Sequence, residues 1–309
     1  MITAGRLAAP GFFIFVEQQK MADDDYYREL TGNPPKGPIQ AIELELDAKI
    51  NFRCHKDIRC FNACCKNIDI TLTPYDILRL KNRLGLSSDD FLVKYAVPFE
   101  MDHHGMPGFK LRSRESTTAC QFMTPQGCGV YEDRPLACRY YPLGVIGMRR
   151  KEESQVANFY FKVVEDHCLG HEELRSISIA DYRREQAVEK YDHFNQEWRK
   201  IVIKKRSAGP TIGKPSERSF QLFQMCSYEL DHFRRFINSD SFKETLNIEP
   251  EDFDKMLEDD ELLLQFAMRF LKQVLFGENT IAYKPNAAGK RKEKRRQRLA
   301  ERRAQEIHQ

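Results

Sequence analysis

The sequence lacks any apolar run near the roughly 18 residues that a membrane-spanning helix needs. The longest candidate, LAAPGFFIFV at residues 7–16, follows a single arginine and has no small-residue cleavage site behind it, so a signal peptide is the less favoured interpretation. The polar segment MADDDYYREL fits the beginning of a soluble protein, which suggests translation from Met21. We therefore expect a cytoplasmic protein with no membrane segment.

A strong overall charge is also lacking, because the formal net charge is only +3. Residues 290–309 carry nine Lys or Arg against three Glu, which leaves the rest of the chain at about −3. Any attraction to nucleic acid must therefore come from this basic tail. No aromatic residue is interleaved there to stack on bases, so a solvated terminus is the simpler interpretation.

Cysteine is plentiful, and its distribution is uneven. Eight of the nine cysteines fall between residues 54 and 168. In a chain without a secretion signal, this density indicates metal binding or redox chemistry rather than a disulfide framework. Cys64 and Cys65 are adjacent, and their Cα atoms, about 3.8 Å apart, are too close for a relaxed disulfide bond. The ninth cysteine, Cys226, lies among the apolar residues of a predicted helix and is expected in the core.

Thiolates from distant segments can converge on one metal ion or cluster, and the eight clustered cysteines are the candidate ligands. Cys60 and Cys64, four residues apart, would share one face of a helical turn. Three histidines are candidate substitutes, although solvated or supporting roles are more common for such residues. The predicted ligands are Cys60, Cys64, Cys65, Cys120, Cys128 and Cys138, then Cys54 and Cys168, with His55, His167 and His171 as the substitutes.

Charge near the cysteines favours the same interpretation. Four thiolates around a divalent ion leave a net charge of about −2, which a protein must offset or solvate. Basic side chains close by would do so, and they would also lower the pKa of the thiols. The residues in question are Lys56, Arg59, Lys66, Arg134 and Arg139.

Sets of four cysteines suit zinc and iron–sulfur centres equally, so zinc, iron and a [4Fe–4S] cluster all stay open, as does the choice between one site and two. One enzyme class is excluded. The radical enzymes that cleave S-adenosylmethionine need cysteines at C-x3-C-x2-C, and Asn67 stands where the third cysteine would be.

The hydrophobic pattern predicts an α+β fold, with a small mixed cysteine-rich domain followed by a mostly helical extension. Strands are expected over 42–52, 68–72 and 155–164, with two short strands about the turn at 124–127. A helix capped by Thr73 and ended by Gly85 is followed by another capped by Ser88. Longer helices are expected from Ser178 to about residue 205, over 220–237 and over 260–276.

The predicted organisation has four parts. Residues 1–40 are a polar segment and linker, and 41–185 form the cysteine-cluster domain. Residues 186–285 are the helical region, and 286–309 are the basic tail.

Three segments contain most of the cysteines: CFNACC, CQFMTPQGCGVYEDRPLACRYYP and CLGHE, with the helical pair between the first two. Together they resemble the cysteine-cluster family that is described as zinc- or iron-chelating domains and named for a C-x2-C-x2-C-C motif. The resemblance covers roughly residues 50–185 and implies metal chelation by the cysteines. The first cluster here is longer, C-x5-C-x3-C-C, which places Cys54 outside the name-giving spacing.

A metal-binding protein is therefore the leading prediction. The alternative is an enzyme that uses the same cysteines, either an iron–sulfur oxidoreductase or, by analogy with a flagellin lysine methylase that has a similar cluster, a protein methylase. A thiol redox sensor is the third interpretation, and it would lose its metal reversibly on mild oxidation.

Overall fold

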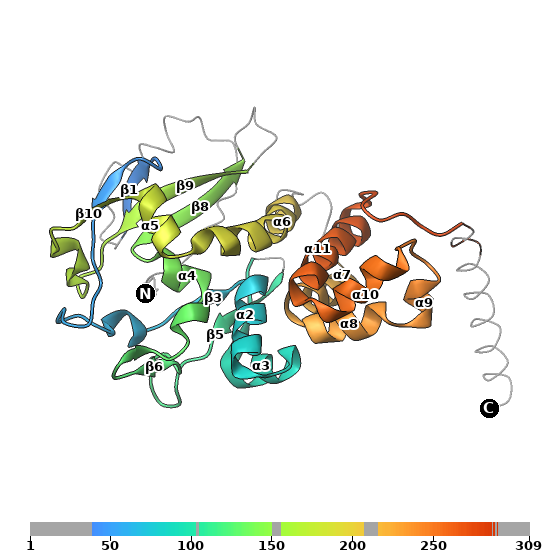
Figure 1. The fold of residues 1–309 in the computed structure, drawn as a ribbon, viewed down its shortest axis with the longest axis horizontal. Helices are drawn as coiled ribbons and strands as arrows, with labels where there is room; N and C mark the ends of the chain where they lie inside the picture. Colours follow the sequence, from blue (N-terminus) through green and yellow to red (C-terminus); the bar gives the residue numbers. More distant parts are fainter. Residues whose placement is uncertain are drawn as a thin grey trace, which may run out of the picture.

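The structure, a computed structural model, describes residues 39–102, 105–149, 156–206 and 216–285, together with residues 287 and 289. Small sheets occupy the N-terminal part of this region and helices the C-terminal part, which confirms the predicted α+β fold (Figure 1). The expected start at Met21 and most of the basic tail lie outside the described residues. Within the described ranges, no helix combines the length and the apolar character needed to cross a bilayer.

The described strands form four small antiparallel sheets. The first has the order β1–β9–β8, the second pairs β10 with β2, the third has the order β3–β5–β4, and the fourth is the β6–β7 hairpin. The strands are β1 (Ile39–Leu44), β2 (Lys49–Asn51), β3 (Thr71–Leu72), β4 (Ala96–Glu100), β5 (Pro107–Leu111), β6 (Met123–Thr124), β7 (Gly127–Cys128), β8 (Leu143–Arg149), β9 (Val156–Val163) and β10 (Ser176–Ser178).

Helices connect these sheets and then continue alone to the end of the described chain. Three single turns of 3-10 helix are η1 (Ala63–Cys65), η2 (Tyr131–Asp133) and η3 (Leu169–Glu172). The α-helices are α2 (Pro74–Leu84), α3 (Ser88–Tyr95), α4 (Leu136–Tyr140), α5 (Ile179–Glu185), α6 (Val188–Arg206), α7 (Glu217–Tyr228), α8 (Leu230–Ile237), α9 (Asp240–Lys243), α10 (Pro250–Glu258) and α11 (Asp260–Phe276).

The first predicted helix is confirmed in detail. Thr73 accepts from the backbone N–H of Asp76, and the Asp76 carboxylate accepts from the backbone N–H of Thr73, which is a complete capping box. Gly85 ends the helix in the left-handed conformation, with φ of 64°. The cap of the next helix is Ser87, one residue before the predicted Ser88.

Three predicted elements are divided in the structure. The strand expected over 42–52 is broken by a turn at 46–47, so that β1 and β2 join different sheets. The helix expected from Ser178 breaks at Ala187, which has φ of 51°, and the helix expected over 220–237 breaks at Glu229. The acidic segment before residue 260, which had no predicted structure, forms α10.

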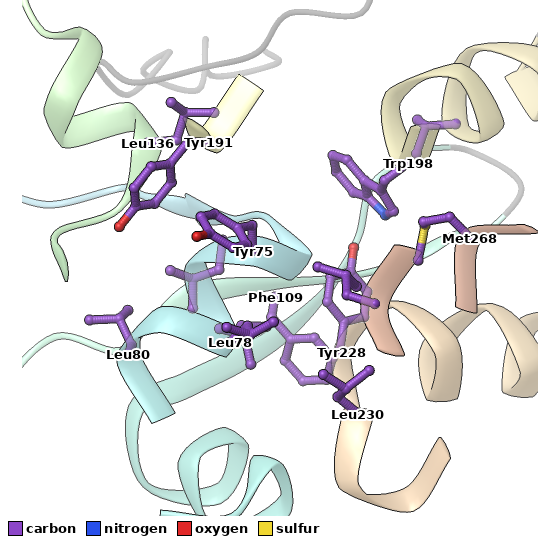
Figure 2. Close-up of a cluster of buried hydrophobic side chains, with 14 of the residues drawn as sticks. Tyr75, Leu78, Leu80, Phe109, Leu136, Tyr191, Trp198, Tyr228, Leu230 and Met268 are labelled. Carbon is purple, nitrogen blue, oxygen red and sulfur yellow. The ribbon is translucent and has the colours of Figure 1, made fainter. Parts of the chain in front are cut away.

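One continuous apolar core joins the cysteine-rich part to the helices. Tyr75 of α2 is central to it, because its ring stacks on Phe194 at 4.6 Å and meets Tyr191 edge-on at 4.9 Å. Trp198 of α6 and Tyr228 of α7 extend the cluster toward α11 (Figure 2). As predicted, Cys226 is fully buried in this core. The helical part therefore supports the elements that position the cysteines.

Candidate metal centre

The eight clustered cysteines all line one cavity of about 1160 Å³. They come from three segments that are far apart in sequence, namely residues 52–70, residues 120–141 and residues 164–170. All of them are free thiols, as is Cys226, which lies elsewhere. The fold therefore brings together the predicted ligands Cys54, Cys60, Cys64, Cys65, Cys120, Cys128, Cys138 and Cys168.

The first segment is attached to the third by backbone hydrogen bonds. Beyond the β2–β10 pairing, the N–H of Phe52 donates to the carbonyl of Arg175, and the N–H of Arg53 donates to the carbonyl of Gly170, both at 3.0 Å. Gly170 has no room for a side chain, since an added Cβ would lie 2.6 Å from the Phe52 ring. Cys54, which is exposed, follows directly and lines the cavity.

The cluster between Cys54 and Cys65 is a series of tight turns rather than a regular helix. Asn62 adopts the left-handed conformation, with φ of 65°, immediately before η1. The Asn62 side chain also donates to the carbonyl of Thr124 at 2.8 Å, which ties the cluster to the hairpin. The expectation that Cys60 and Cys64 share one helical face is therefore wrong, because Asn62 interrupts the turn between them.

The hairpin carries the next two cysteines. Cys128 on β7 pairs with Met123 on β6, and the backbone N–H of Cys120 donates to the carbonyl of Cys65 at 2.8 Å. The N–H of Phe122 points to the Cys120 sulfur at 3.4 Å. The predicted strands about the turn at 124–127 are thus confirmed, and they stand directly against the first cluster.

Cys138 lies on α4, and the start of this helix is held by α2. Asp76 is fully buried, and its second carboxylate oxygen accepts from the backbone N–H of Leu136 at 2.8 Å. Arg139 is buried too, and it donates to the carbonyls of Arg134 and Gln186 at 3.0 and 2.9 Å. Arg139, expected from the sequence to offset thiolate charge, is therefore also a structural residue.

The third segment brings Cys168 beside the first cluster. The backbone N–H of Leu169 donates to the Cys60 sulfur at 3.3 Å, and the N–H of Cys168 donates to the carbonyl of Glu165 at 2.8 Å. Tyr141 and Glu165, which the sequence did not single out, line the same cavity, where Tyr141 interacts with both Cys168 and Glu165.

Of the three histidines, two line the cavity. His55 has a buried ring nitrogen without a hydrogen-bond partner, although the Glu173 carboxylate lies 3.4 Å away. His167 lies 3.6 Å from the Glu165 carboxylate. His171 is not among the cavity-lining residues; one ring nitrogen pairs with the carbonyl of Val163, and the ring packs on Phe52. His171 is therefore the least suitable of the three as a substitute ligand.

The thiols are harder to ionise than the sequence suggested. Desolvation, followed by the negative charge of neighbouring Cys64, Cys60 and Cys168 thiolates, raises the pKa of Cys54 to about 11. Burial is also the largest cause of the raised pKa values of Cys120, Cys128, Cys138 and Cys168. Arg134 and Arg139 lower the pKa of Cys128, but burial outweighs them, so the expected net lowering by basic neighbours is wrong for these thiols.

This arrangement suits a cation, because several thiolates held together in a desolvated cavity repel one another and a metal ion would offset their charge. Among the described residues, however, no three Cys, His, Asp or Glu side chains already stand at ligand spacing. The sulfurs of Cys64 and Cys65 are 3.9 Å apart, which is close to the separation of two thiolates that share one tetrahedral metal ion at about 2.3 Å. Other side chains would have to move toward this pair to complete a metal site.

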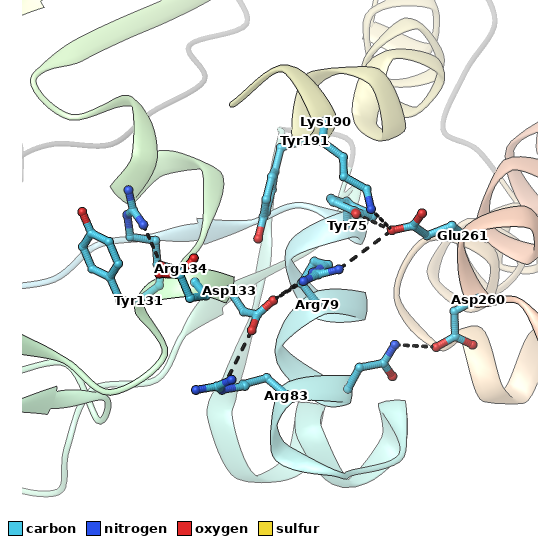
Figure 3. A network of polar contacts seen from close by, with 12 residues as sticks. Tyr75, Arg79, Arg83, Tyr131, Asp133, Arg134, Lys190, Tyr191, Asp260 and Glu261 are labelled. Carbon is cyan, nitrogen blue, oxygen red and sulfur yellow. Dashed lines mark hydrogen bonds and ion pairs between the residues drawn. The ribbon is translucent and has the colours of Figure 1, made fainter. Parts of the chain in front are cut away.

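A polar network supports the cavity from the outside. Asp133 lies in η2, between the segments of Cys128 and Cys138, and Arg79 of α2 donates to its carboxylate at 2.9 and 2.5 Å. Glu261 of α11 accepts from the Tyr75 hydroxyl at 2.5 Å and pairs with Lys190 at 2.7 Å (Figure 3). The network therefore links the hairpin side of the cavity to the C-terminal helices.

The fold and the cavity define a cysteine-rich region followed by helices. Residues 53–169 match the family model of CxxCxxCC, described as a putative zinc- or iron-chelating domain. The predicted resemblance is thus confirmed over this range. Comparisons with curated proteins and with solved structures give no significant match.

Proposed function

We propose that the protein binds zinc or iron through the cysteines that line the cavity. The observation that carries the proposal is the convergence of eight cysteines, from three distant segments, on one cavity, while Cys226 lies apart from them in the helical core. Apolar packing gives no reason to gather thiols in this way. The family match of residues 53–169 supports the same conclusion.

The bound metal would supply positive charge that keeps the thiols ionised, and it would fix the turns of residues 54–65 against the hairpin. Free, clustered thiols persist in reducing compartments, so we also propose that the protein acts in the cytoplasm. A zinc or iron–sulfur centre closed by four thiolates would have a structural or electron-carrying role.

Anaerobic purification followed by elemental analysis and an absorption spectrum tests this proposal. We expect a stoichiometric metal; zinc gives a colourless protein, and an iron–sulfur centre gives visible absorption. The Cys226→Ala variant should retain the full amount of metal and serves as the matched control. A folded protein that contains neither zinc nor iron, and takes up neither after reduction, would contradict the proposal.

The second candidate is an enzyme that uses the same cysteines, as an iron–sulfur oxidoreductase or a protein methylase. The size of the cavity favours it, because about 1160 Å³ exceeds the space that metal ions need and is enough to hold a small molecule. The Tyr141 hydroxyl and the Glu165 carboxylate, which belong to residues that line the cavity, would be suitable polar contacts for a ligand. Mass spectrometry of small molecules released from the denatured protein, S-adenosylmethionine in particular, tests this candidate.

A further inference from the structure

The described part of the chain buries four Lys or Arg side chains, namely Lys81, Arg134, Arg139 and Arg199. Two of them have carboxylate partners, since Lys81 pairs with Asp231 and Asp260, and Arg199 pairs with Asp192. The other two, Arg134 and Arg139, form no ion pair with a carboxylate of the described residues. A buried charge is stable when an opposite charge lies close to it. These two guanidinium groups therefore indicate a source of negative charge other than a carboxylate.

Arg134 is held in place by neutral groups. It is 7% exposed, and it donates to the carbonyl of Tyr131 and to the side-chain oxygen of Gln186, both at 2.6 Å. Its guanidinium lies over the Tyr131 ring, 3.9 Å from the ring centre (Figure 3). Arg134 also lines the cavity, as do Cys128 and Cys138 on either side of it in the sequence.

Arg139 is held in the same way. It is 4% exposed, and it donates to the carbonyls of Glu132, Gln186 and Arg134 and to the Tyr191 hydroxyl, at 2.5, 2.9, 3.0 and 3.1 Å. It does not line the cavity, but it follows Cys138 directly on α4.

The nearby carboxylate of Asp76 does not replace the missing partner. It acts on Arg139 through space, but its two oxygens accept from the backbone N–H groups of Thr73 and Leu136, and it forms no ion pair with Arg139. The cavity thiols are therefore the groups beside both guanidiniums that can become anionic.

Burial separates these two arginines from the other basic residues near the cysteines. Lys56, Arg59 and Lys66 are exposed, so water hydrates and screens their charges. Charges that are shielded from water interact more strongly with their neighbours. Of the five residues predicted to offset thiolate charge, Arg134 and Arg139 are thus the two that are placed to do so.

We infer that Arg134 and Arg139 are the counter-ions of a metal centre with four thiolates, and that the metal binds tightly only because of their positive charge. The inference rests on the proposed function, which it deepens by assigning the charge of the centre. When a divalent ion M²⁺ binds four thiols, RSH, the products are [M(SR)₄]²⁻ and four protons. The two guanidinium groups supply the charge that matches this anion.

Two substitutions at one position separate the charge of Arg134 from its hydrogen bonds. Arg134→Gln removes the charge, whereas Arg134→Lys keeps the charge and loses the planar fork of donors. We expect Arg134→Gln to weaken Zn²⁺ binding by about 10–100-fold, measured by competition with a chelator, and Arg134→Lys to keep most of the affinity. Arg235→Gln, which removes the same formal charge from an exposed pair, is the control and should bind Zn²⁺ like the wild type.

The melting temperature of each variant shows whether the effect is only structural. Arg134→Gln should lower the melting temperature of the zinc-loaded chain more than that of the reduced, metal-free chain. Equal losses in the two states, or equal loss of Zn²⁺ affinity in the Gln and Lys variants, would overturn the inference.

Proton release from the wild-type chain tests the charge of the centre without any variant. Calorimetric titration of the reduced, metal-free chain with Zn²⁺, in buffers of different ionisation enthalpy, should show about four protons released per zinc ion bound. Release of three or fewer would mean a less negative centre and would overturn the inference, while the proposed function would stand. The proposed function fails on a different result, namely a wild-type chain that takes up neither zinc nor iron.

Discussion

Asp76 and Leu136 are joined by a buried hydrogen bond, in which the backbone N–H that begins α4 donates to a carboxylate oxygen of α2 at 2.8 Å. The other oxygen of Asp76 accepts from the backbone N–H of Thr73, also at 2.8 Å. The Asp76 carboxylate therefore caps the N-termini of both α2 and α4, although Leu136 lies 60 residues further along the chain. Because α4 carries Cys138, this residue helps to position one wall of the cavity.

Asp76 should give the fold a specific pH dependence. Burial raises the pKa of its carboxyl from 3.8 to about 6, although the hydrogen bonds from Thr73 and Leu136 oppose this change. The folded state thus holds the proton more tightly than the unfolded chain. Protonation of Asp76 therefore adds about 3 kcal/mol to the free energy of unfolding. This contribution is complete below pH 4 and is lost as the pH rises through 6.

The Asp76→Asn variant isolates this contribution, since an amide does not titrate. The free energy of unfolding of the wild type, relative to that of the variant, should fall between pH 4 and pH 6 and then level off. Urea unfolding across this range, with both chains in the same metal state, measures the difference. A difference that stays constant, or rises with pH, would contradict the assigned pKa.

Gly170 should not tolerate even the smallest side chain. In Gly170→Ala the new Cβ would meet the Phe52 ring at 2.6 Å and the Arg53 carbonyl at 3.1 Å. We expect a loss of about 1–3 kcal/mol in the free energy of unfolding, because backbone or ring must move. Denaturant unfolding gives the value. Gly289→Ala, where nothing lies within 4 Å of the added atom, is the control and should change stability by less than about 0.5 kcal/mol.

The ion pair between Arg79 and Asp133 should contribute more to the free energy of unfolding than an exposed ion pair does. Asp133 is only 6% exposed, so Arg79→Met would leave its carboxylate without its closest cation, at a cost of about 2–4 kcal/mol. Arg235→Met removes a pair with Asp89 in which both side chains are well exposed, and it should cost less than about 1 kcal/mol. Equal effects of the two variants on urea unfolding would mean that the network does not support the hairpin.

Metal removal should change which thiols react with an alkylating reagent. In the metal-loaded protein the eight cavity cysteines are expected to be protected, because a ligating thiolate is not free to attack. After treatment with a chelator, the exposed cavity cysteines Cys54 and Cys64 should become open to modification, and the buried Cys226 should stay unmodified. Peptide mass spectrometry identifies the modified residues. The same modification pattern with and without chelator would argue against ligation by these cysteines.

Local signals in the sequence predicted the local structure well. The segment from Thr73 to Gly85 contains its own cap, its first proline and its own stop, and the helix has those boundaries. The same holds for the capped start at Ser178. Two of the errors occur where single non-glycine residues take the left-handed conformation, at Asn62 and Ala187, because composition gives no sign of these breaks.

The convergence of the cysteines could be anticipated, but its arrangement could not. The types of residue and their density indicated a metal site. The hydrogen bonds that position the cysteines, such as Leu169 to Cys60 and Cys120 to Cys65, join residues that are 109 and 55 positions apart in sequence. Burial of the thiols also depends on the whole fold, which is why the basic neighbours led to the wrong direction of pKa change. The placement of Tyr141 and Glu165 at the cavity carried no sequence signal apart from their nearness to Cys138 and Cys168.

X-ray absorption at the edge of the bound metal, measured on anaerobically purified wild-type protein, tests the central claim most directly. If the cavity thiolates hold the metal, the spectrum will show a shell of about four sulfur atoms near 2.3 Å. That shell should persist in Cys226→Ala, whose missing thiol lies outside the cavity. A first shell made only of nitrogen or oxygen atoms near 2.0–2.2 Å would contradict metal binding by these cysteines.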